Sequence, residues 1–90
     1  MGLDELREQI NACDNELILL LKKRLDVCQQ IGEYKKANGI QVLQTGRFNE
    51  LQEVWAEKAG EIGLNRDFSK QMFELIHDES VRLQQSIQEK

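Results

Sequence analysis

The fold of this chain is decided by residues 3–37, which read LDELREQINACDNELILLLKKRLDVCQQIGEYKKA. No residue in this segment forces a break, and apolar residues recur at helical spacing, so the segment predicts one helix of about 33 to 35 residues, roughly 50 Å long. A compact domain of 90 residues has a radius of gyration of only about 12 Å. The helix must therefore project beyond the core of its own chain, and its apolar stripe predicts a second subunit.

Two shorter helices follow. A second helix is predicted over about residues 45–61, where Thr45 can cap the first turn, and a third over about 66–88, where Asn65 is a good N-cap. No internal repeat or domain linker separates them, so residues 1–90 are expected to form one all-α domain of three helices. The side chains expected to be buried in the two shorter helices are Phe48, Leu51, Trp55, Ile62, Phe68, Met72, Phe73, Leu75, Ile76, Leu83 and Ile87.

Composition argues against two classes of partner. The 90 residues include no Pro and six Gly, 31% of them are charged, and the net charge is −4. Lys and Arg are interspersed with Asp and Glu, which argues against a nucleic-acid partner and against binding to an anionic membrane surface. We expect no signal peptide, and the 90 residues contain no apolar run long enough to span a bilayer.

The two cysteines fit a reducing compartment. Cys13 and Cys28 are fifteen residues apart, which in one helix is roughly 22 Å and too far for a disulfide. They are predicted to be buried thiols. Together with the absence of a signal peptide, this favours a cytoplasmic protein.

Charged side chains interrupt the apolar seam of the long helix. Alternating steps of three and four residues define this seam as Leu3, Arg7, Ile10, Asp14, Leu17, Leu21, Arg24, Cys28, Ile31 and Lys35. A parallel row at seven-residue steps, from Leu6 to Tyr34, is uncharged, so the seam is not simply the wet side of the helix. Cations on such a seam cost stability unless they are paired or hold a ligand.

The spacing of these cations suggests a shared pocket. Arg24 and Lys35 are about 20° apart in azimuth and roughly 16 Å apart along the axis, so both can point into one pocket from its two ends. Arg7 lies roughly 25 Å before Arg24, too far to reach that pocket in its own chain. In an antiparallel two-fold pair of helices, Arg7 of one chain can approach Arg24 of the other. The alternative is that each cation bends out to solvent or pairs with an acid such as Asp14.

The other helices offer further candidates. Ser80 and Gln84 share one face of the third helix, and Arg47 opens the second as a possible anion-binding group. The alternatives are polar residues at a half-buried edge and an exposed arginine near a helix start. His77 shares the face of Gln84, and a lone histidine provides neither a metal site nor a catalytic triad.

Several segments together resemble the all-α (AroQ-class) chorismate mutases. The opening signature L-x-x-L-R-x-x-I is weakly specific alone and becomes strong when joined to the later positions. The resemblance covers almost the whole chain without a gap, and it rests on LDELREQI at 3–10, Asp14, KRL at 23–25, IGEYK at 31–35, DESV at 78–81 and QQ at 84–85.

This resemblance implies an intertwined homodimer with two equivalent sites, which converts chorismate to prephenate in aromatic amino-acid (Phe/Tyr) biosynthesis without a cofactor or metal. By match, Arg24 and the Arg7 of the partner subunit would bind the two carboxylates of the substrate. Ser80 would assist them, Lys35 and Gln84 would contact the ether oxygen, and Arg47 matches an arginine at the pocket edge.

Two positions depart from the family pattern. Phe48 stands where many members carry a Glu or Gln that holds the ring hydroxyl, and Gln44 stands where an Asp can occur. Gln44, Asn49 or a backbone group is a candidate replacement for the missing hydroxyl contact. His77 stands near a position where an apolar residue often lines the pocket.

Three functional readings stay open at this stage. The first is a chorismate mutase, free-standing or fused to another shikimate-pathway enzyme. The second is an isochorismate-pyruvate lyase, which shares this fold and cation set. The third is a non-catalytic helical module for dimerisation or regulation that has kept the cations.

Overall fold

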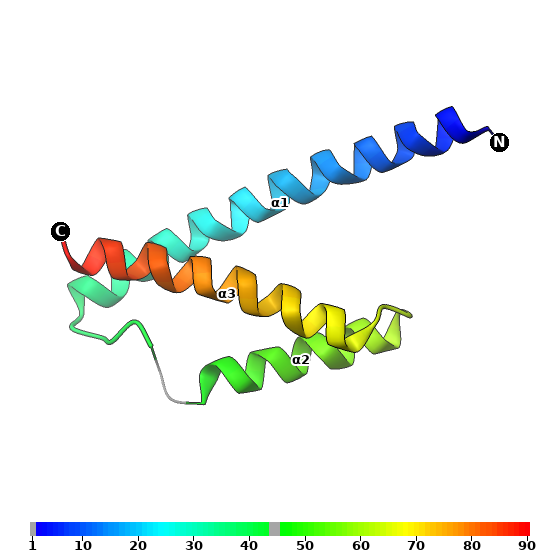
Figure 1. Ribbon diagram of the computed structural model, residues 1–90. Coiled ribbons are helices and arrows are strands. Elements are labelled where there is room, and N and C mark those ends of the chain that lie inside the picture. Colours follow the sequence, from blue (N-terminus) through cyan, green and yellow to red (C-terminus); the bar gives the residue numbers. More distant parts are fainter. Residues whose placement is uncertain (1, 44–45) are drawn as a thin grey trace.

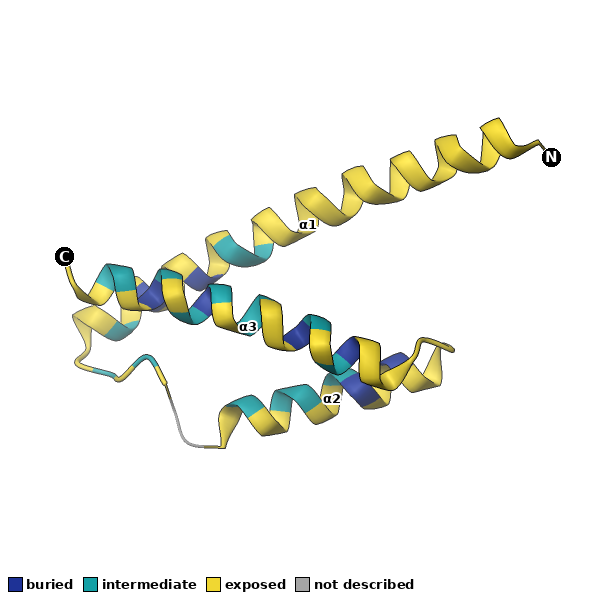
Figure 2. Ribbon diagram, viewed as in Figure 1, coloured by how far each residue is buried: buried dark blue, intermediate teal, exposed yellow. Residues whose placement is uncertain are grey.

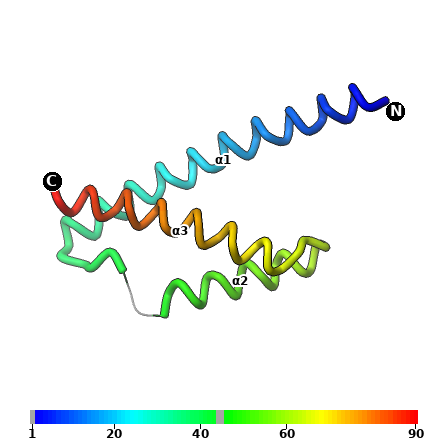
Figure 3. The backbone as a smooth tube through the Cα atoms, viewed as in Figure 1, coloured from blue at the N-terminus to red at the C-terminus, as the bar shows by residue number. Residues whose placement is uncertain are grey.

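The computed structural model describes residues 2–43 and 46–90 and contains three helices (Figure 1). They are α1 (Leu3–Ala37), α2 (Arg47–Glu61) and α3 (Arg66–Gln88), and the described residues contain no strand. The expected all-α architecture with a very long first helix is confirmed. Helix α3 packs against both α1 and α2, and the C-terminus lies beside the end of α1 (Figure 3). No helix in the described part of the chain is long and apolar enough to cross a membrane.

Helix α1 extends far beyond the rest of the chain. The principal extents are 55 × 25 × 14 Å and the radius of gyration is 16.4 Å, compared with about 12 Å for a compact chain of this length. Every residue from 2 to 23 is exposed (Figure 2). The exposed apolar side chains of this projecting half are Leu3, Leu6, Ile10, Leu17, Ile18, Leu19, Leu20 and Leu21. Cys13 lies there too, so the prediction that both cysteines are buried is right for Cys28 and wrong for Cys13 in the single chain.

The helix ends agree only partly with the sequence signals. Helix α2 begins at Arg47, and its N-cap is Gly46 in the left-handed region at φ 85°, with no side-chain cap. The expected cap, Thr45, lies outside the described residues. The predicted cap of α3 is confirmed, because the Asn65 side chain accepts a hydrogen bond from the Phe68 amide at 2.8 Å.

The core is small and centred on Phe73. This side chain is fully buried, and its ring packs against the half-buried Trp55 at a centroid distance of 5.1 Å. Beneath it, Ala56 and Ala59 are buried on α2. These small residues let α2 and α3 approach closely.

The predicted burial of three apolar residues is wrong for the single chain. Phe68, Leu75 and Ile62 are exposed at 54%, 72% and 76%. Phe68 and Leu75 lie about 140° to 160° around α3 from Phe73, on a face that neither α1 nor α2 covers. The stripe that α3 buries instead consists of Ser69, Phe73, Ser80 and Gln84. It is more polar than the sequence pattern predicted.

Close contact between α1 and α3 depends on Gly32. A Cβ atom at this position would lie 3.0 Å from Cδ1 of Ile87, 3.1 Å from Cγ of Gln84 and 3.3 Å from the Cα of Gln84. These distances are shorter than ordinary van der Waals contact. Glycine therefore sets how near the backbone of α3 comes to α1, beside Gln84.

Gly32→Ala should make the protein less stable than Gly60→Ala by about 1 kcal/mol or more. Alanine in place of a helical glycine normally adds roughly 0.5–1 kcal/mol. At Gly60 the new Cβ would meet only the Arg66 side chain, at 3.4 Å or more, so that gain should be realised there. Urea unfolding at one protein concentration measures the difference in the free energy of unfolding. Equal stability of the two variants would show that α3 shifts to accommodate the new Cβ atom without loss of stability.

Candidate active site

A cavity of about 440 Å³ lies where the C-terminal half of α1, the start of α2 and the middle of α3 meet. From α1 the lining side chains follow one another at steps of four, three and four residues, which places them on one helical face. The described residues that line the cavity are Arg24, Cys28, Ile31, Lys35, Val42, Leu43, Arg47, Phe48, Leu51, His77, Ser80, Val81 and Gln84.

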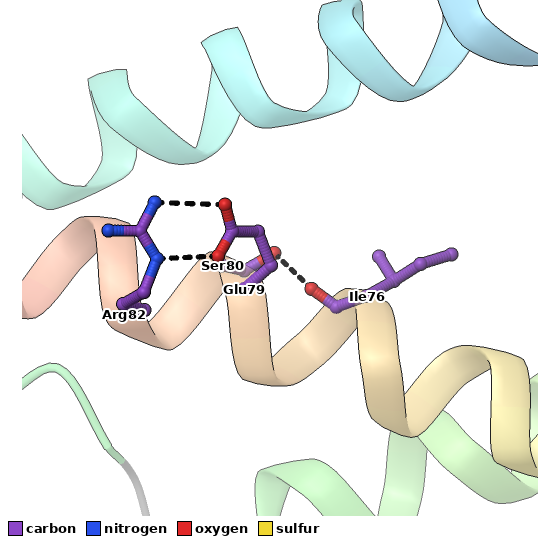
Figure 4. Close-up of polar contacts among 4 residues, drawn as sticks. All are labelled: Ile76, Glu79, Ser80 and Arg82. Carbon is purple, nitrogen blue, oxygen red and sulfur yellow. Dashed lines mark hydrogen bonds and ion pairs between the residues drawn. The ribbon is translucent and has the colours of Figure 1, made fainter.

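One end of the cavity is built around the hydroxyl of Ser80. This hydroxyl donates to the carbonyl oxygen of Ile76 at 2.9 Å, one turn earlier in α3 (Figure 4). Its oxygen therefore accepts the hydrogen bonds from Nη1 of Arg24 at 3.0 Å and from Sγ of Cys28 at 3.3 Å. Ser80 is only 5% exposed. The buried hydroxyl thus fixes where the guanidinium of Arg24 lies.

The other end is built around the ammonium of Lys35. Nζ donates to the carbonyl oxygen of Val42 at 2.9 Å and to Oε1 of Gln84 at 3.2 Å. A lysine ammonium has three donors and no acceptor. One proton of Lys35 therefore stays available for a ligand. Because the amide of Gln84 presents its oxygen to Lys35, its NH₂ group is the part left to donate elsewhere.

The cavity carries an excess of positive charge. Arg24, Lys35 and Arg47 line it, whereas no Asp or Glu does so among the described lining residues. Elsewhere on the surface some cations are paired with acids: Lys70 lies 3.0 Å from Glu53, and Arg82 makes a bidentate contact with Glu79 (Figure 4). An uncompensated cluster of cations in a cavity is suited to a ligand with more than one anionic group.

An aromatic wall closes the side of the cavity between α2 and α3. The ring of His77 lies 4.8 Å from that of Phe48 and 5.8 Å from that of Phe73, nearly parallel to the latter. Burial lowers the pKa of His77 below its ordinary value of 6.5, the charge of Asp78 opposes this shift, and the charge of Arg24 adds to it. Phe48 is therefore part of the core packing as well as of the cavity wall.

The structure brings together five of the predicted site residues: Arg24, Lys35, Arg47, Ser80 and Gln84. Arg7 is not among them, because it lies on the exposed projecting half of α1. Gln44 lies outside the described residues. No role beyond burial was predicted for Cys28, although its place one turn after Arg24 on the seam was a signal. No sequence signal marked the Val42 carbonyl, since every residue has a backbone carbonyl group.

No group of three or more His, Cys, Asp or Glu side chains in the described residues is placed to hold a metal ion. The polar groups of the cavity are donors on nitrogen and one hydroxyl, which suit an anion. Such a site can orient a ligand and stabilise negative charge on it.

Comparison with known proteins agrees with this geometry. The chain is 32% identical over 82 residues to a 4-amino-4-deoxychorismate mutase of Streptomyces pristinaespiralis, and 28% identical over 82 residues to one of Streptomyces venezuelae. Each match covers 91% of this chain, with 64% of the first relative and 80% of the second. A 3-dehydroquinate dehydratase of Pyrobaculum aerophilum is 38% identical over 76 residues, which are 83% of this chain and 21% of that protein.

This chain thus spans just under two thirds of the first relative's length and about a fifth of the dehydratase's. The family model described as chorismate mutase type II matches residues 6–85 of this chain. The matched segment includes Arg7, Arg24, Lys35, Ser80 and Gln84. This match covers nearly the whole chain, and it includes residues from both helices that supply the Arg24 and Lys35 ends of the cavity. The chain therefore belongs to the chorismate mutase type II family.

Proposed function

We propose that the protein catalyses the rearrangement of chorismate to prephenate. The observation that carries this proposal is the set of three cations, without a facing carboxylate in the described lining, around one cavity that also holds Ser80 and Gln84. Chorismate carries two carboxylates and an ether oxygen, so its anionic groups complement these donors. The reaction is intramolecular: the ether C–O bond breaks while a C–C bond forms, and no proton is transferred.

Such a reaction needs orientation and charge stabilisation rather than a nucleophile. The enolpyruvyl arm has to be held over the ring, and negative charge grows on the ether oxygen as its bond breaks. In our proposal Lys35 donates a hydrogen bond to that oxygen through its remaining N–H group. Its other two hydrogen bonds, to Val42 and Gln84, hold the ammonium in place before the substrate arrives. The NH₂ group of Gln84 adds a second donor.

The carboxylates are assigned to the arginines. The Ser80 hydroxyl orients Arg24 by accepting a hydrogen bond from one of its N–H groups. The other N–H groups of the guanidinium are left to bind a carboxylate. Arg47 lines the same cavity from the first residue of α2. Ser80 therefore supports substrate binding chiefly through Arg24 in this proposal.

A homodimer completes the site. The projecting half of α1 exposes eight large apolar side chains, more than a stable monomer normally leaves uncovered on one segment. A second copy that packs antiparallel on this half covers the stripe and brings the partner's Arg7 to the cavity. The Phe/Tyr pathway role, a fusion to another pathway enzyme and a cytoplasmic location stay predictions from the sequence.

The names of the two Streptomyces relatives raise a second candidate substrate, 4-amino-4-deoxychorismate. It carries an ammonium group where chorismate carries a hydroxyl. We expect kcat/KM to be at least about 10-fold higher for chorismate, since a cation among Arg24, Lys35 and Arg47 is repelled by more than about 1 kcal/mol. Turnover of both substrates, followed by ultraviolet absorbance, measures the ratio. A preference for the amino compound would show that 4-amino-4-deoxychorismate is the substrate. Release of pyruvate from isochorismate would show that the protein is an isochorismate-pyruvate lyase.

Lys35→Ala should lower kcat by roughly 100- to 1,000-fold with a much smaller change in KM, because the lost donor acts on charge that develops only in the transition state. Lys36→Ala is the matched control. That neighbouring ammonium is exposed and contacts only the carbonyl oxygen of Lys90. An effect of Lys35→Ala on KM alone, in a folded variant, would remove the proposed role.

Arg7→Ala and Arg24→Ala should each be nearly inactive, yet unfolding and refolding them together should recover about a quarter of wild-type activity. Random pairing makes about half the dimers mixed, and each mixed dimer has one intact site with Arg7 from one chain and Arg24 from the other. Mass spectrometry confirms subunit exchange. Recovery no greater than the sum of the separate variants would show that both arginines serve a site within one chain.

A further inference from the structure

We infer that His77 is a further cationic contact for the substrate, the fourth from its own chain, and that its imidazole takes up a proton as the substrate binds. This inference rests on the proposed function, because it assumes a ligand with two carboxylates in the cavity. The resulting histidinium would strengthen substrate binding below neutral pH.

The position of His77 places its ring at the ligand. The residue lies three positions before Ser80 and seven before Gln84 on α3, so all three share the face that lines the cavity. The ring is half-buried and lies against both Phe48 and Phe73, nearly parallel to Phe73 and tilted by 47° from Phe48. Stacking uses the faces of an imidazole and leaves its two nitrogen atoms at the edge.

Neither ring nitrogen has a hydrogen-bond partner in the described part of the chain. By contrast, the hydroxyl of Ser80 is saturated by Ile76, Arg24 and Cys28. The amide oxygen of Gln84 accepts from Lys35. Gln84 keeps only its NH₂ group for a ligand, whereas both ring nitrogens of His77 are uncommitted in the described part of the chain. A ligand that enters the cavity supplies the missing partner.

The charges around His77 decide its protonation state. Arg24 on α1 and Arg47 on α2 line the same cavity, as does Lys35, and on its own helix Asp78 is the neighbouring acid. In the empty cavity, burial and Arg24 keep the imidazole neutral, and Asp78 only partly opposes them. Two substrate carboxylates offset two of the positive charges around the imidazole, so the bound complex favours the imidazolium more than the free site does.

The direction of the resulting pH dependence follows from linkage. If binding raises the pKa of His77, the complex holds more protons than the free enzyme between the two pKa values. Affinity then rises as pH falls through the pKa of the complex and levels off below that of the free enzyme. A difference of about one pKa unit corresponds to a 10-fold change in affinity.

The chain contains one histidine, so proton NMR of the wild-type protein reports its titration without a variant. Between about pH 5.5 and 8, the imidazole resonances should titrate at least half a unit higher with saturating prephenate than without it. Prephenate is the proposed product and keeps both carboxylates, so it occupies the site without turnover. A midpoint that stays the same or falls at saturation overturns the inference.

Kinetics supply the second test. For wild type, the KM for chorismate should fall by roughly 3- to 10-fold from pH 8 to pH 6. His77→Phe keeps a ring for the stack, and its KM should be flat over this range. Asp78→Asn, the control, should keep the dependence and shift it to lower pH, because it removes an acid and leaves the imidazole.

The outcomes separate the two proposals. Absence of both chorismate turnover and prephenate binding would overturn the proposed function and this inference with it. Normal turnover with the same KM profile in wild type and His77→Phe would overturn this inference alone.

Discussion

The structure depends on one constraint: a helix of 35 residues cannot be covered by the other 55 residues of a 90-residue chain. Helix α3 covers only the C-terminal part of α1, from about Arg24 onward, and α2 packs on α3. The covered part holds the cavity, and the uncovered part holds Arg7 and the apolar stripe. Covering that stripe with a second copy and completing the site with its Arg7 would therefore be one event. In the proposed dimer, stability and activity share a single interface.

Within the chain, binding chemistry has displaced part of the hydrophobic core. Helix α3 buries Ser80 and Gln84, whereas Phe68 and Leu75 face outward. A buried polar group is tolerable only when it is hydrogen-bonded. Ser80 meets this condition through Ile76, Arg24 and Cys28, and Gln84 meets it through Lys35. No buried side-chain nitrogen or oxygen in the described residues lacks a partner.

The cavity holds three cations, Arg24, Lys35 and Arg47, with no carboxylate among the described lining residues. Arg24 and Lys35 approach from opposite ends, and each is fixed by a neutral acceptor, Ser80 or Gln84, rather than by a carboxylate. A carboxylate partner would hold the cation more tightly but would neutralise it. Neutral acceptors fix the orientation of each cationic side chain and leave its positive charge available to the ligand. Burial lowers the pKa of His77 in the free site, and the charge of Arg24 adds to this shift.

The sequence by itself determined the helical architecture and most of the site. Uninterrupted helical spacing over residues 3–37 predicted α1, and cations on an apolar seam marked Arg24 and Lys35. These features are local, because helix periodicity depends only on neighbours along the chain. Only the tertiary structure decided which stripe of α3 is buried, since Phe68 and Phe73 are equally apolar and packing against α1 and α2 selects the second. The Gly32 contact, the Val42 carbonyl at Lys35 and the ring contact between Phe48 and His77 likewise join residues from different elements. Such contacts depend on how helices pack, which composition and spacing along one helix do not encode.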